Sequence, residues 1–328
     1  MLYFCTLFDS NYLTRGLSMY ESLKSKCKNF HLYIFPFDNK CYDILTGMDL
    51  NNVTVIKLDE FEDPDLLNVK PSRSNVEYCW TCTPSIILYS IKKFNLSHCT
   101  YLDADLYFYS SPYGLVQELG DRSVLITEHR YTSKYDQTKV SGIYCVQFVT
   151  FKNDDIGLKV LKWWRDACLN WCYMKSENGK FGDQKYLDDW PDRFEEIHVL
   201  QNLGGGVAPW NVQQYNLYKL NNIIYIKDNL TLKTEKLVFY HFHGVKFFKN
   251  RNVDLNSGYF ISDSVKDLLY KGYIKKLNKV KNEISKIDNT FDPNGSIKLN
   301  KNLKMYWLFL QYKLKHTYNF ICSEDFTK

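Results

Sequence analysis

Asp103 and Asp105 flank a single alanine at the end of an apolar segment, and they are the residues of this sequence best suited to chemistry. If residues 99–106 form a strand, both side chains point to the same face, because side chains alternate along a strand. Two adjacent carboxylates repel each other unless a cation lies between them, and a divalent metal ion is the simplest such partner. A metal ion held there could neutralise the diphosphate of a departing nucleotide. The alternative is a pair of solvated turn residues after an edge strand.

A second group of candidate ligands lies far downstream, at His241 and His243. Strand alternation would place both imidazoles on one face, and Mn²⁺ accepts imidazole together with carboxylate ligands. Gly244 would let the backbone come close to a phosphate, and Lys246 could contact that phosphate. Two histidines on a strand are more often structural. The aspartate pair upstream shifts the balance towards a metal site.

The elements that must position these residues alternate between strand and helix. Apolar runs rich in strand formers predict strands at 2–7, 30–35, 53–58, 99–106, 124–127 and 143–151. Helical spacing predicts helices that begin at Leu13 and that cover 78–94, 158–173 and a segment from Gln184, with Pro84 tolerable only near the start of its helix. This order predicts an α/β fold, a mostly parallel sheet flanked by helices. The aspartate pair then falls at the C-terminal end of a central strand, where open α/β sheets bind ligands.

Composition and charge distinguish the two ends of the chain. Its 328 residues, 45% hydrophobic and 24% charged, suit one large globular domain with an appendage. The net charge is −3 over residues 1–245 and +8 over residues 246–328. Lysine-rich helices are expected at 265–287 and 303–318. We therefore expect a catalytic domain at 1–248 and a basic helical C-terminal extension at 249–328.

The extension admits two interpretations. A basic amphipathic helix can lie on an anionic membrane, and the alternative is a helix packed on the catalytic domain with a solvated lysine face. The sequence has no apolar stretch long enough to span a bilayer and no signal peptide, so we expect a cytoplasmic protein; on the first interpretation it would also be peripheral at the inner face of the membrane. Its 10 cysteines are then reduced thiols, and Cys79-x-x-Cys82 lacks the second pair that a zinc site needs. Nucleic acid is not an expected partner.

Four motifs in one order carry a family resemblance. They are Phe4-Cys-Thr-Leu-Phe-Asp-Ser-Asn11, the Asp-x-Asp at 103–105, Gly182-Asp183-Gln184, and His241-x-x-Gly244 followed by Lys246. Over about residues 2–248 the chain resembles the GT-A-fold, nucleotide-sugar-dependent glycosyltransferases. Its pattern is similar to that of the glycogenin-like and bacterial lipopolysaccharide galactosyltransferases of glycosyltransferase family 8.

The resemblance implies a role for each matching residue. The nucleobase and ribose would contact Thr6, Leu7 and Asp9, with Arg15 near by. Asp103, Asp105 and His241 would hold the metal ion, with Asp103 also counted in the nucleotide site. Lys246 would touch the diphosphate, although it follows His241 by five residues where the family more often has six, and His243 is a rival ligand. Asp183 and Gln184 would be the catalytic residues, on the side of the donor sugar and the acceptor.

Some of these residues have structural alternatives. Asp183 could instead cap the helix that starts at Gln184. Trp210, in the glycine-rich loop 203–211, is either a stacking platform for a sugar ring or part of the core. Trp80 and Thr83 are candidates for the nucleotide pocket.

The predicted function is a metal-dependent glycosyltransferase. It would move a hexose or N-acetylhexosamine from a UDP-sugar to an acceptor hydroxyl with Mn²⁺ (or Mg²⁺), with retention of configuration favoured. The acceptor would be a surface glycan or glycolipid. One rival is a haloacid-dehalogenase-type phosphotransferase, in which Thr or Val usually lies where this chain has Tyr107. The other is a catalytically inactive nucleotide- or sugar-binding module.

Overall fold

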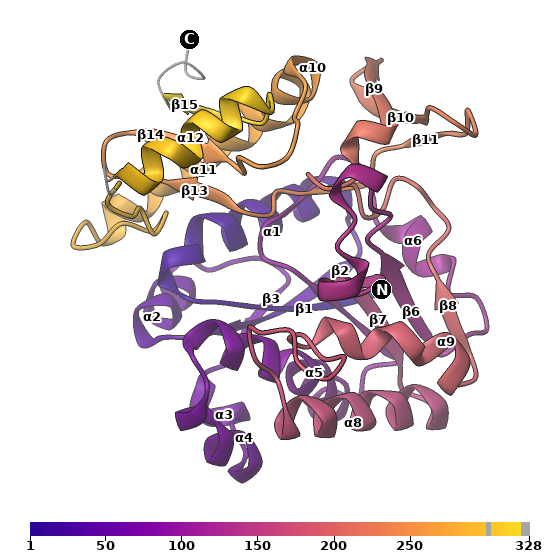
Figure 1. Ribbon diagram of the computed structural model, residues 1–328. Coiled ribbons are helices and arrows are strands. Elements are labelled where there is room, and N and C mark those ends of the chain that lie inside the picture. Colours follow the sequence, from indigo (N-terminus) through magenta and orange to yellow (C-terminus); the bar gives the residue numbers. More distant parts are fainter. Residues whose placement is uncertain (300–302, 323–328) are drawn as a thin grey trace.

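A seven-stranded sheet forms the centre of the molecule (Figure 1). The computed structural model describes residues 1–299 and 303–322. The strands lie in the order β3-β2-β1-β4-β7-β6-β8, and only β7 runs antiparallel to its neighbours. Their bounds are β1 (Leu2–Phe8), β2 (Phe30–Pro36), β3 (Val53–Val55), β4 (His98–Leu102), β6 (Val124–Glu128), β7 (Tyr144–Lys152) and β8 (Ile197–Val199). The predicted α/β fold with a mostly parallel sheet is therefore confirmed.

Helices cover both faces of this sheet. One apolar cluster joins Phe4 and Phe8 of β1 to Leu13 and Leu17 of α1, and another joins the opposite face to α5 and α8. In Figure 1 the α5–α8 layer lies below the sheet and α1 above it. The α-helices between residues 1 and 248 are α1 (Leu13–Lys26), α2 (Asn39–Gly47), α3 (Leu58–Phe61), α4 (Pro64–Val69), α5 (Asn75–Lys93), α6 (Tyr113–Gln117), α7 (Thr138–Ser141), α8 (Asp155–Asn170) and α9 (Trp190–Arg193).

Capping residues explain where several helices begin. The Asp9 carboxylate accepts hydrogen bonds from the backbone N–H groups of Asn11 and Tyr12, which starts the turn leading into α1. Ser74 and Glu77 form a capping box, so α5 begins at Asn75, before the predicted start. Pro84 consequently lies in the middle of α5, and the expectation that it would lie near the helix start was wrong.

Three smaller sheets complete the fold. Their strands are β5 (Leu106–Phe108) with β12 (Phe239–His241), β9 (Tyr215–Leu220) with β10 (Ile223–Asp228) and β11 (Thr234–Lys236), and β13 (Val245–Phe247) with β14 (Asn252–Leu255) and β15 (Phe320–Cys322). The strand predicted at 99–106 is thus divided. β4 ends at Leu102 and β5 begins at Leu106, so both aspartates lie in the turn between them and not on a strand.

The C-terminal segment packs on the rest of the chain. Its helices are α10 (Asp263–Val265), a π-helical turn (Lys266–Tyr270), α11 (Lys271–Ile287) and α12 (Leu303–Leu314). Leu277 of α11 lies in one apolar cluster with Tyr240 and Phe242, and Val280 lies in the cluster of α1. The apolar face of α11 is therefore occupied by protein. The clusters continue across the predicted boundary at 248/249, and residues 300–302 and 323–328 of the extension lie outside the described residues.

Among the described residues, no helix combines the length and the apolar character that crossing a bilayer requires.

Replacing Leu277 by alanine is expected to lower the free energy of unfolding by about 2–5 kcal/mol, because a fully buried side chain is removed from a packed cluster. The matched variant Lys275→Ala changes an exposed position of the same helix and is expected to cost less than about 0.5 kcal/mol. Urea unfolding of both variants measures the difference. Equal effects would contradict the assignment of α11 to the core.

Candidate functional site

The antiparallel pairing of β5 with β12 brings the two groups of candidate ligands together. Leu106 lies opposite His241 in this pairing, and the Phe242 backbone N–H donates to the Asp105 carbonyl oxygen. The His241 Nε2 atom is 3.0 Å from Asp105 Oδ1 and 3.6 Å from Asp103 Oδ2. The structure therefore places Asp103, Asp105 and His241, three residues singled out from the sequence, around one point.

The charges of these residues depend on one another. Burial raises the pKa of Asp103 to about 6, although the nearby His241 lowers it. Burial would also raise the pKa of Asp105, but the positive charge of His241 and its hydrogen bond lower that pKa to about 2. Burial lowers the pKa of His241, and the Asp105 carboxylate outweighs this and holds it well above its usual value. Without a metal ion, the His241 imidazolium thus balances the buried Asp105 carboxylate and the half-buried Asp103 carboxyl group.

Two neighbours fix the orientation of the His241 ring. The Nδ1 atom lies 2.8 Å from Oε1 of Gln147, to which it donates, so Nε2 is directed at the carboxylates. The indole of Trp210 meets His241 and His243 edge-on, with ring centroids 5.4 Å and 5.5 Å apart, and its Nε1 donates to the His129 carbonyl oxygen. Gln147 is fully buried in the middle of β7. A metal-ligating histidine is typically held in this way by a second hydrogen bond.

The donor atoms fit a divalent cation. Carboxylate and imidazole are the ligand types that Mn²⁺ accepts. In the structure the proton on His241 Nε2 lies between the imidazole and the Asp105 carboxylate, and a metal ion could replace this proton. The closest three-residue group consists of Asp105, His241 and His243, whose ligand atoms all lie within 4.8 Å of one another. His243 follows β12 in a turn, so the alternation argument does not place it, yet it stays a rival ligand. The His243 side chain is exposed at one side, and desolvation by the surrounding protein together with the charge of His241 lowers its pKa to about 4.

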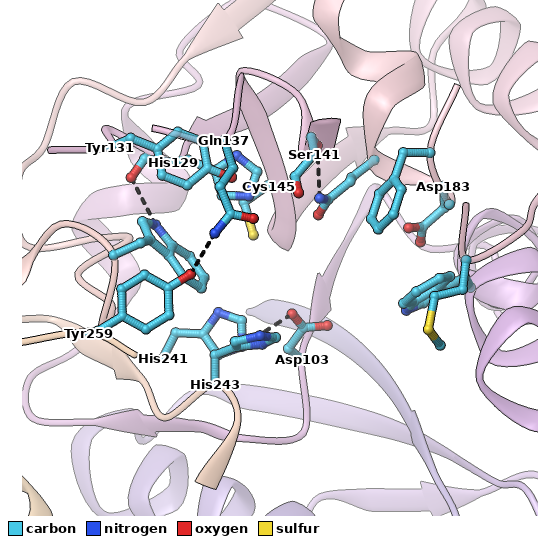
Figure 2. A pocket seen from close by; sticks show the side chains of 16 residues that line it. Asp103, His129, Tyr131, Gln137, Ser141, Cys145, Asp183, His241, His243 and Tyr259 are labelled. Atoms are coloured by element: carbon cyan, nitrogen blue, oxygen red, sulfur yellow. Dashed lines mark hydrogen bonds and ion pairs between the residues drawn. The ribbon is translucent and has the colours of Figure 1, made fainter. Parts of the chain in front are cut away.

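A cavity of about 350 Å³ opens beside these ligands (Figure 2). The Asp183 carboxyl lies across it from His241 and His243. The residues that line the cavity are Trp80, Asp103, His129, Tyr131, Gln137, Ser141, Cys145, Met174, Phe181, Gly182, Asp183, Gln184, Trp210, His241, His243 and Tyr259. Two of the sequence-predicted sugar-side residues, Asp183 and Gln184, therefore share one cavity with the candidate metal ligands.

Asp183 does not cap the turn that follows it. Its side chain makes no capping hydrogen bond, and its backbone is already helical, with φ −91° and ψ −25°. Its carbonyl oxygen instead accepts from Trp164 Nε1, which fixes the backbone and leaves the carboxyl at the cavity wall. Burial raises the pKa of Asp183 to about 7, with a further contribution from Asp103. The Gln184 amide donates to the Ser141 carbonyl oxygen.

The N-terminal residues predicted for the nucleotide lie in or next to β1. Thr6 and Leu7 are buried in β1, and the Thr6 hydroxyl has no hydrogen-bond partner among the described residues. Asp9 serves as the cap described above. Arg15 donates to the carbonyl oxygens of Asn294 and Val245, so it ties α1 to the C-terminal segment rather than pointing freely at a ligand.

Lys246 lies on β13 with an exposed side chain. After burial and His241, its charge further lowers the pKa of His243, which places it on the histidine side of the site.

Several residues of the site were not found from the sequence, namely Gln147, which contacts His241, and the lining residues His129, Tyr131 and Tyr259. Gln147 carried a signal, because it is a lone amide in the otherwise apolar run of β7. His129, Tyr131 and Tyr259 carried none: the first two follow the end of β6, and Tyr259 reaches the cavity from beyond residue 248 through a hydrogen bond from Gln137 Nε2. Trp210, for which two roles were open, is 5% exposed and lines the cavity as well.

The chain is similar in sequence to two bacterial proteins. It is 31% identical over 290 residues to the uncharacterized protein YfnD of Bacillus subtilis (strain 168), covering 86% of this chain and 90% of YfnD. It is 28% identical over 252 residues to the uncharacterized protein YfnF of the same organism, covering 74% of this chain and 81% of YfnF. No protein-family model matches the sequence.

The fold is similar to those of solved glycosyltransferases. The galactosyltransferase LgtC, in complex with donor and acceptor sugar analogues, superposes with a TM-score of 0.52 at 11% identity, covering 85% of this chain and 96% of LgtC. The bifunctional glycosyltransferase WbbM gives a TM-score of 0.53 at 13% identity, covering 87% of this chain and 51% of WbbM. At these identities the likeness concerns the fold, and the GT-A fold expected from the sequence is confirmed.

The variant Asp183→Asn is expected to be more stable than the wild-type protein at pH 8 when both are free of metal and nucleotide. The folded-state pKa of about 7 exceeds the ordinary value of 3.8, so the native state loses stability as the pH rises between these values. The amide avoids this loss, which is about 1.4 kcal/mol for each pH unit at most. Thermal unfolding in EDTA at pH 4.5 and pH 8 measures it. A stability difference that does not grow with pH would contradict the raised pKa.

Proposed function

The chain belongs to the protein family of Bacillus subtilis YfnD and has the GT-A fold, and from these premises we propose that it is a metal-dependent glycosyltransferase with a nucleotide-sugar donor. One observation carries the proposal. Asp103, Asp105 and His241 converge, and Asp103 and His241 line a cavity whose opposite side holds Asp183. This arrangement offers a place for a diphosphate beside a place for a sugar.

Different residues bind different parts of the nucleotide-sugar donor. Asp103, Asp105 and His241 hold Mn²⁺ or Mg²⁺, with Gln147 keeping the His241 ring in place. The metal ion stabilises the negative charge of the leaving nucleoside diphosphate. Lys246 adds a positive charge on the histidine side of the diphosphate. Thr6, Leu7 and Asp9 contact the nucleobase and ribose of UDP.

Asp183 and Gln184 position the sugar and the acceptor. The carboxyl of Asp183, with a pKa near 7, can donate or accept a hydrogen bond with a sugar hydroxyl close to neutral pH. The Gln184 amide nitrogen donates to the Ser141 carbonyl oxygen, and this hydrogen bond keeps the Gln184 amide oxygen in a fixed position. In a retaining reaction the leaving phosphate takes the acceptor proton, so the protein needs a positioning carboxyl rather than a strong base. We favour a retaining reaction, with a hexose or N-acetylhexosamine as the transferred group.

A thermal-shift panel of UDP, GDP, ADP and CDP, each with and without Mn²⁺, tests the proposal. UDP with Mn²⁺ is expected to raise the midpoint, since a ligand at a hundredfold excess over its Kd stabilises the native state by about 2.7 kcal/mol. UDP without Mn²⁺ should give a much smaller shift. A response to another nucleotide would change the donor, and no response to any would favour an inactive module.

Variants of the ligands make the same measurement specific. Asp105→Asn and His241→Ala are expected to abolish the Mn²⁺-dependent part of the UDP shift, because each removes a donor atom from the site. His243→Ala is the matched control, since its ring also meets Trp210 edge-on. A larger loss in His243→Ala than in His241→Ala would exchange the two histidines in the assignment.

The acceptor is proposed to be a glycan or glycolipid at a membrane surface, reached through α12 rather than α11. Apolar and aromatic side chains of α12 are exposed, with Trp307 at 64% and Leu314 at 73%. The basic residues Lys313 and Lys315 stand beside them, also exposed. Exposed aromatic and aliphatic groups among lysines suit the interface of an anionic bilayer.

The double variant Trp307→Ser, Leu314→Ser is expected to bind anionic phosphatidylglycerol vesicles at least tenfold more weakly than the wild-type protein. The reason is that these side chains would enter the headgroup region. Co-sedimentation at low and high salt measures the binding. Leu230→Ser, at a residue that is 90% exposed in the turn between β10 and β11, is the control. Unchanged binding in the double variant would contradict the assignment to α12.

A further inference from the structure

The small sheet of β9, β10 and β11 has one face in the protein and the other in water. Leu217, Ile224 and Ile226 point inward, into the apolar cluster that contains Tyr240 and Phe242. Because side chains alternate along a strand, every second residue points outward, and these residues form what we call the outer face. Figure 1 shows the sheet projecting at the upper right of the molecule. The residues of the outer face are Asn216, Tyr218 and Leu220 of β9, Ile223, Tyr225 and Lys227 of β10, and Thr234 and Lys236 of β11.

The outer face is less polar than a sheet face in water usually is. An antiparallel sheet with one face in water normally alternates between apolar residues inside and polar residues outside. Here Leu220 pairs with Ile223 and Tyr218 pairs with Tyr225, so four apolar or aromatic side chains lie together. Tyr218 is 37% exposed and Leu220 is 55% exposed. A contiguous exposed patch of this kind indicates a binding surface.

Two tyrosine rings lie at the centre of the outer face. The ring centroids of Tyr218 and Tyr225 are 5.6 Å apart, and the ring planes differ by 16°. Neither hydroxyl has a hydrogen-bond partner within the part of the chain that the structure describes. A phenol ring combines a flat apolar surface with a polar end. Two nearly parallel rings with free hydroxyls therefore suit a ligand that presents both C–H and hydroxyl groups, which is the chemistry of a sugar chain.

Two lysines give the outer face a positive charge. Lys227 follows Tyr225 on the same side of β10, and Lys236 lies opposite Tyr225 on β11. Among the described residues, neither ammonium group has an ion pair or hydrogen bond, and no residue of the outer face is acidic. Both lysines can therefore pair with an anionic ligand. They make a protein partner less suitable, since lysine is depleted in protein–protein interfaces.

The carboxylates of the same sheet are used away from the outer face. The Asp228 carboxylate accepts hydrogen bonds from backbone N–H groups of the turn that follows β10. Glu235 alternates to the inner side, where it accepts from the Leu203 backbone N–H, and it pairs with Lys233 at 2.7 Å. Neither carboxylate therefore neutralises the two free lysines.

The sheet is joined directly to the wall of the cavity. Trp210 lines the cavity, and the chain runs from it through a short helical turn (Val212–Gln214) into β9. Eight residues lead from Trp210 to Tyr218, and a fully extended chain of that length spans at most about 28 Å. The Gln214 side chain donates to the Arg130 carbonyl oxygen at 2.7 Å, which fixes the start of β9 to the cavity wall. A long ligand could therefore occupy the cavity and the outer face together.

We propose that the outer face binds an acidic glycan chain. The rings of Tyr218 and Tyr225 pack against its sugar rings, and Lys227 and Lys236 pair with its anionic groups. Its identification as the acceptor rests on the proposed function: one end of the acceptor enters the cavity while the rest of the chain lies along the sheet. The acceptor is then a long acidic glycan, because a short or neutral one makes no use of this face.

Binding of polymers to the chain without nucleotide or metal tests the inference. The probes are polygalacturonate and hyaluronate as acidic glycans, dextran as a neutral glycan, and polyglutamate as an acidic polymer without sugars, each immobilised for biolayer interferometry. The better of the two acidic glycans is expected to bind at least tenfold more tightly than dextran and polyglutamate, and more weakly at high salt. The inference is overturned if neither acidic glycan binds more tightly than dextran. It is also overturned if polyglutamate binds equally well, which would indicate an acidic protein partner.

Two double variants test whether this binding takes place on the outer face. Tyr218→Ala with Tyr225→Ala removes both rings, and Lys227→Ala with Lys236→Ala removes both free charges. Each double variant is expected to weaken the binding of acidic glycans at least tenfold, because the stacking surface or the charge partner is lost. The lysine pair should also lose most of the salt dependence. Unchanged binding in both double variants would place the glycan elsewhere and refute the inference.

Two single variants are the controls. Tyr113→Ala removes a tyrosine that is 57% exposed on α6, and Lys219→Ala removes an exposed lysine of β9 that alternates away from the outer face. Both should bind the acidic glycans as the wild-type protein does. The Mn²⁺-dependent UDP shift should be the same in all variants, which shows that they are folded. Its absence in the wild-type protein would refute the proposed function and leave the glycan measurement valid.

Sedimentation of the wild-type protein and the tyrosine double variant tests the other occupant, a second copy of this chain. Both are expected to sediment as the same species. A wild-type dimer that the double variant converts to a monomer would make the outer face an interface between copies, and the inference would fail.

Discussion

The short antiparallel pairing of β5 with β12 is the constraint on which the site depends. It sets Leu106 opposite His241 and so joins the aspartate turn to a segment more than a hundred residues downstream. Without it the buried Asp105 carboxylate would lose the imidazolium that pairs with it, and a buried charge without a partner opposes folding. The ion pair between His241 and Asp105 and the strand pairing therefore stabilise each other, and the metal site is assembled as part of the fold.

The residues around this pairing limit what the site can do. Gln147 and Trp210 reach the His241 ring from β7 and from the glycine-rich loop, so its orientation is set from two sides. Asp183 has no comparable cation, and burial, with a further contribution from Asp103, raises its pKa to about 7. The two halves of the cavity thus differ: under the proposed function one would hold a divalent cation beside a diphosphate, and the other offers the Asp183 carboxyl and the Gln184 amide for hydrogen bonding.

The sequence predicted the strand–helix order and the candidate metal ligands, because apolar periodicity and short motifs are local properties. It placed the aspartates on a strand when they lie in a turn, since a turn between two strands of one apolar run has no signal of its own. The position of Pro84 within its helix was predicted wrongly, because the capping box that starts α5 lies further upstream than the predicted helix start. Tyr259 could not be found at all. Its place at the cavity depends on tertiary packing of a segment assigned to the extension, where no chemical motif marks it.

Arg15 shows why the C-terminal segment belongs to the machinery of the site. Its guanidinium donates to the carbonyl oxygens of Val245 and Asn294, so it holds both β13 and a loop beyond α11 against α1. Arg130 acts in the same way on the glycine-rich loop. The arginines nearest the site thus stabilise backbone, which leaves Lys246 and a metal ion to balance the charge of a substrate. Under the proposed function, positive charge would then be concentrated at the diphosphate, and shape and hydrogen bonding would select the sugar.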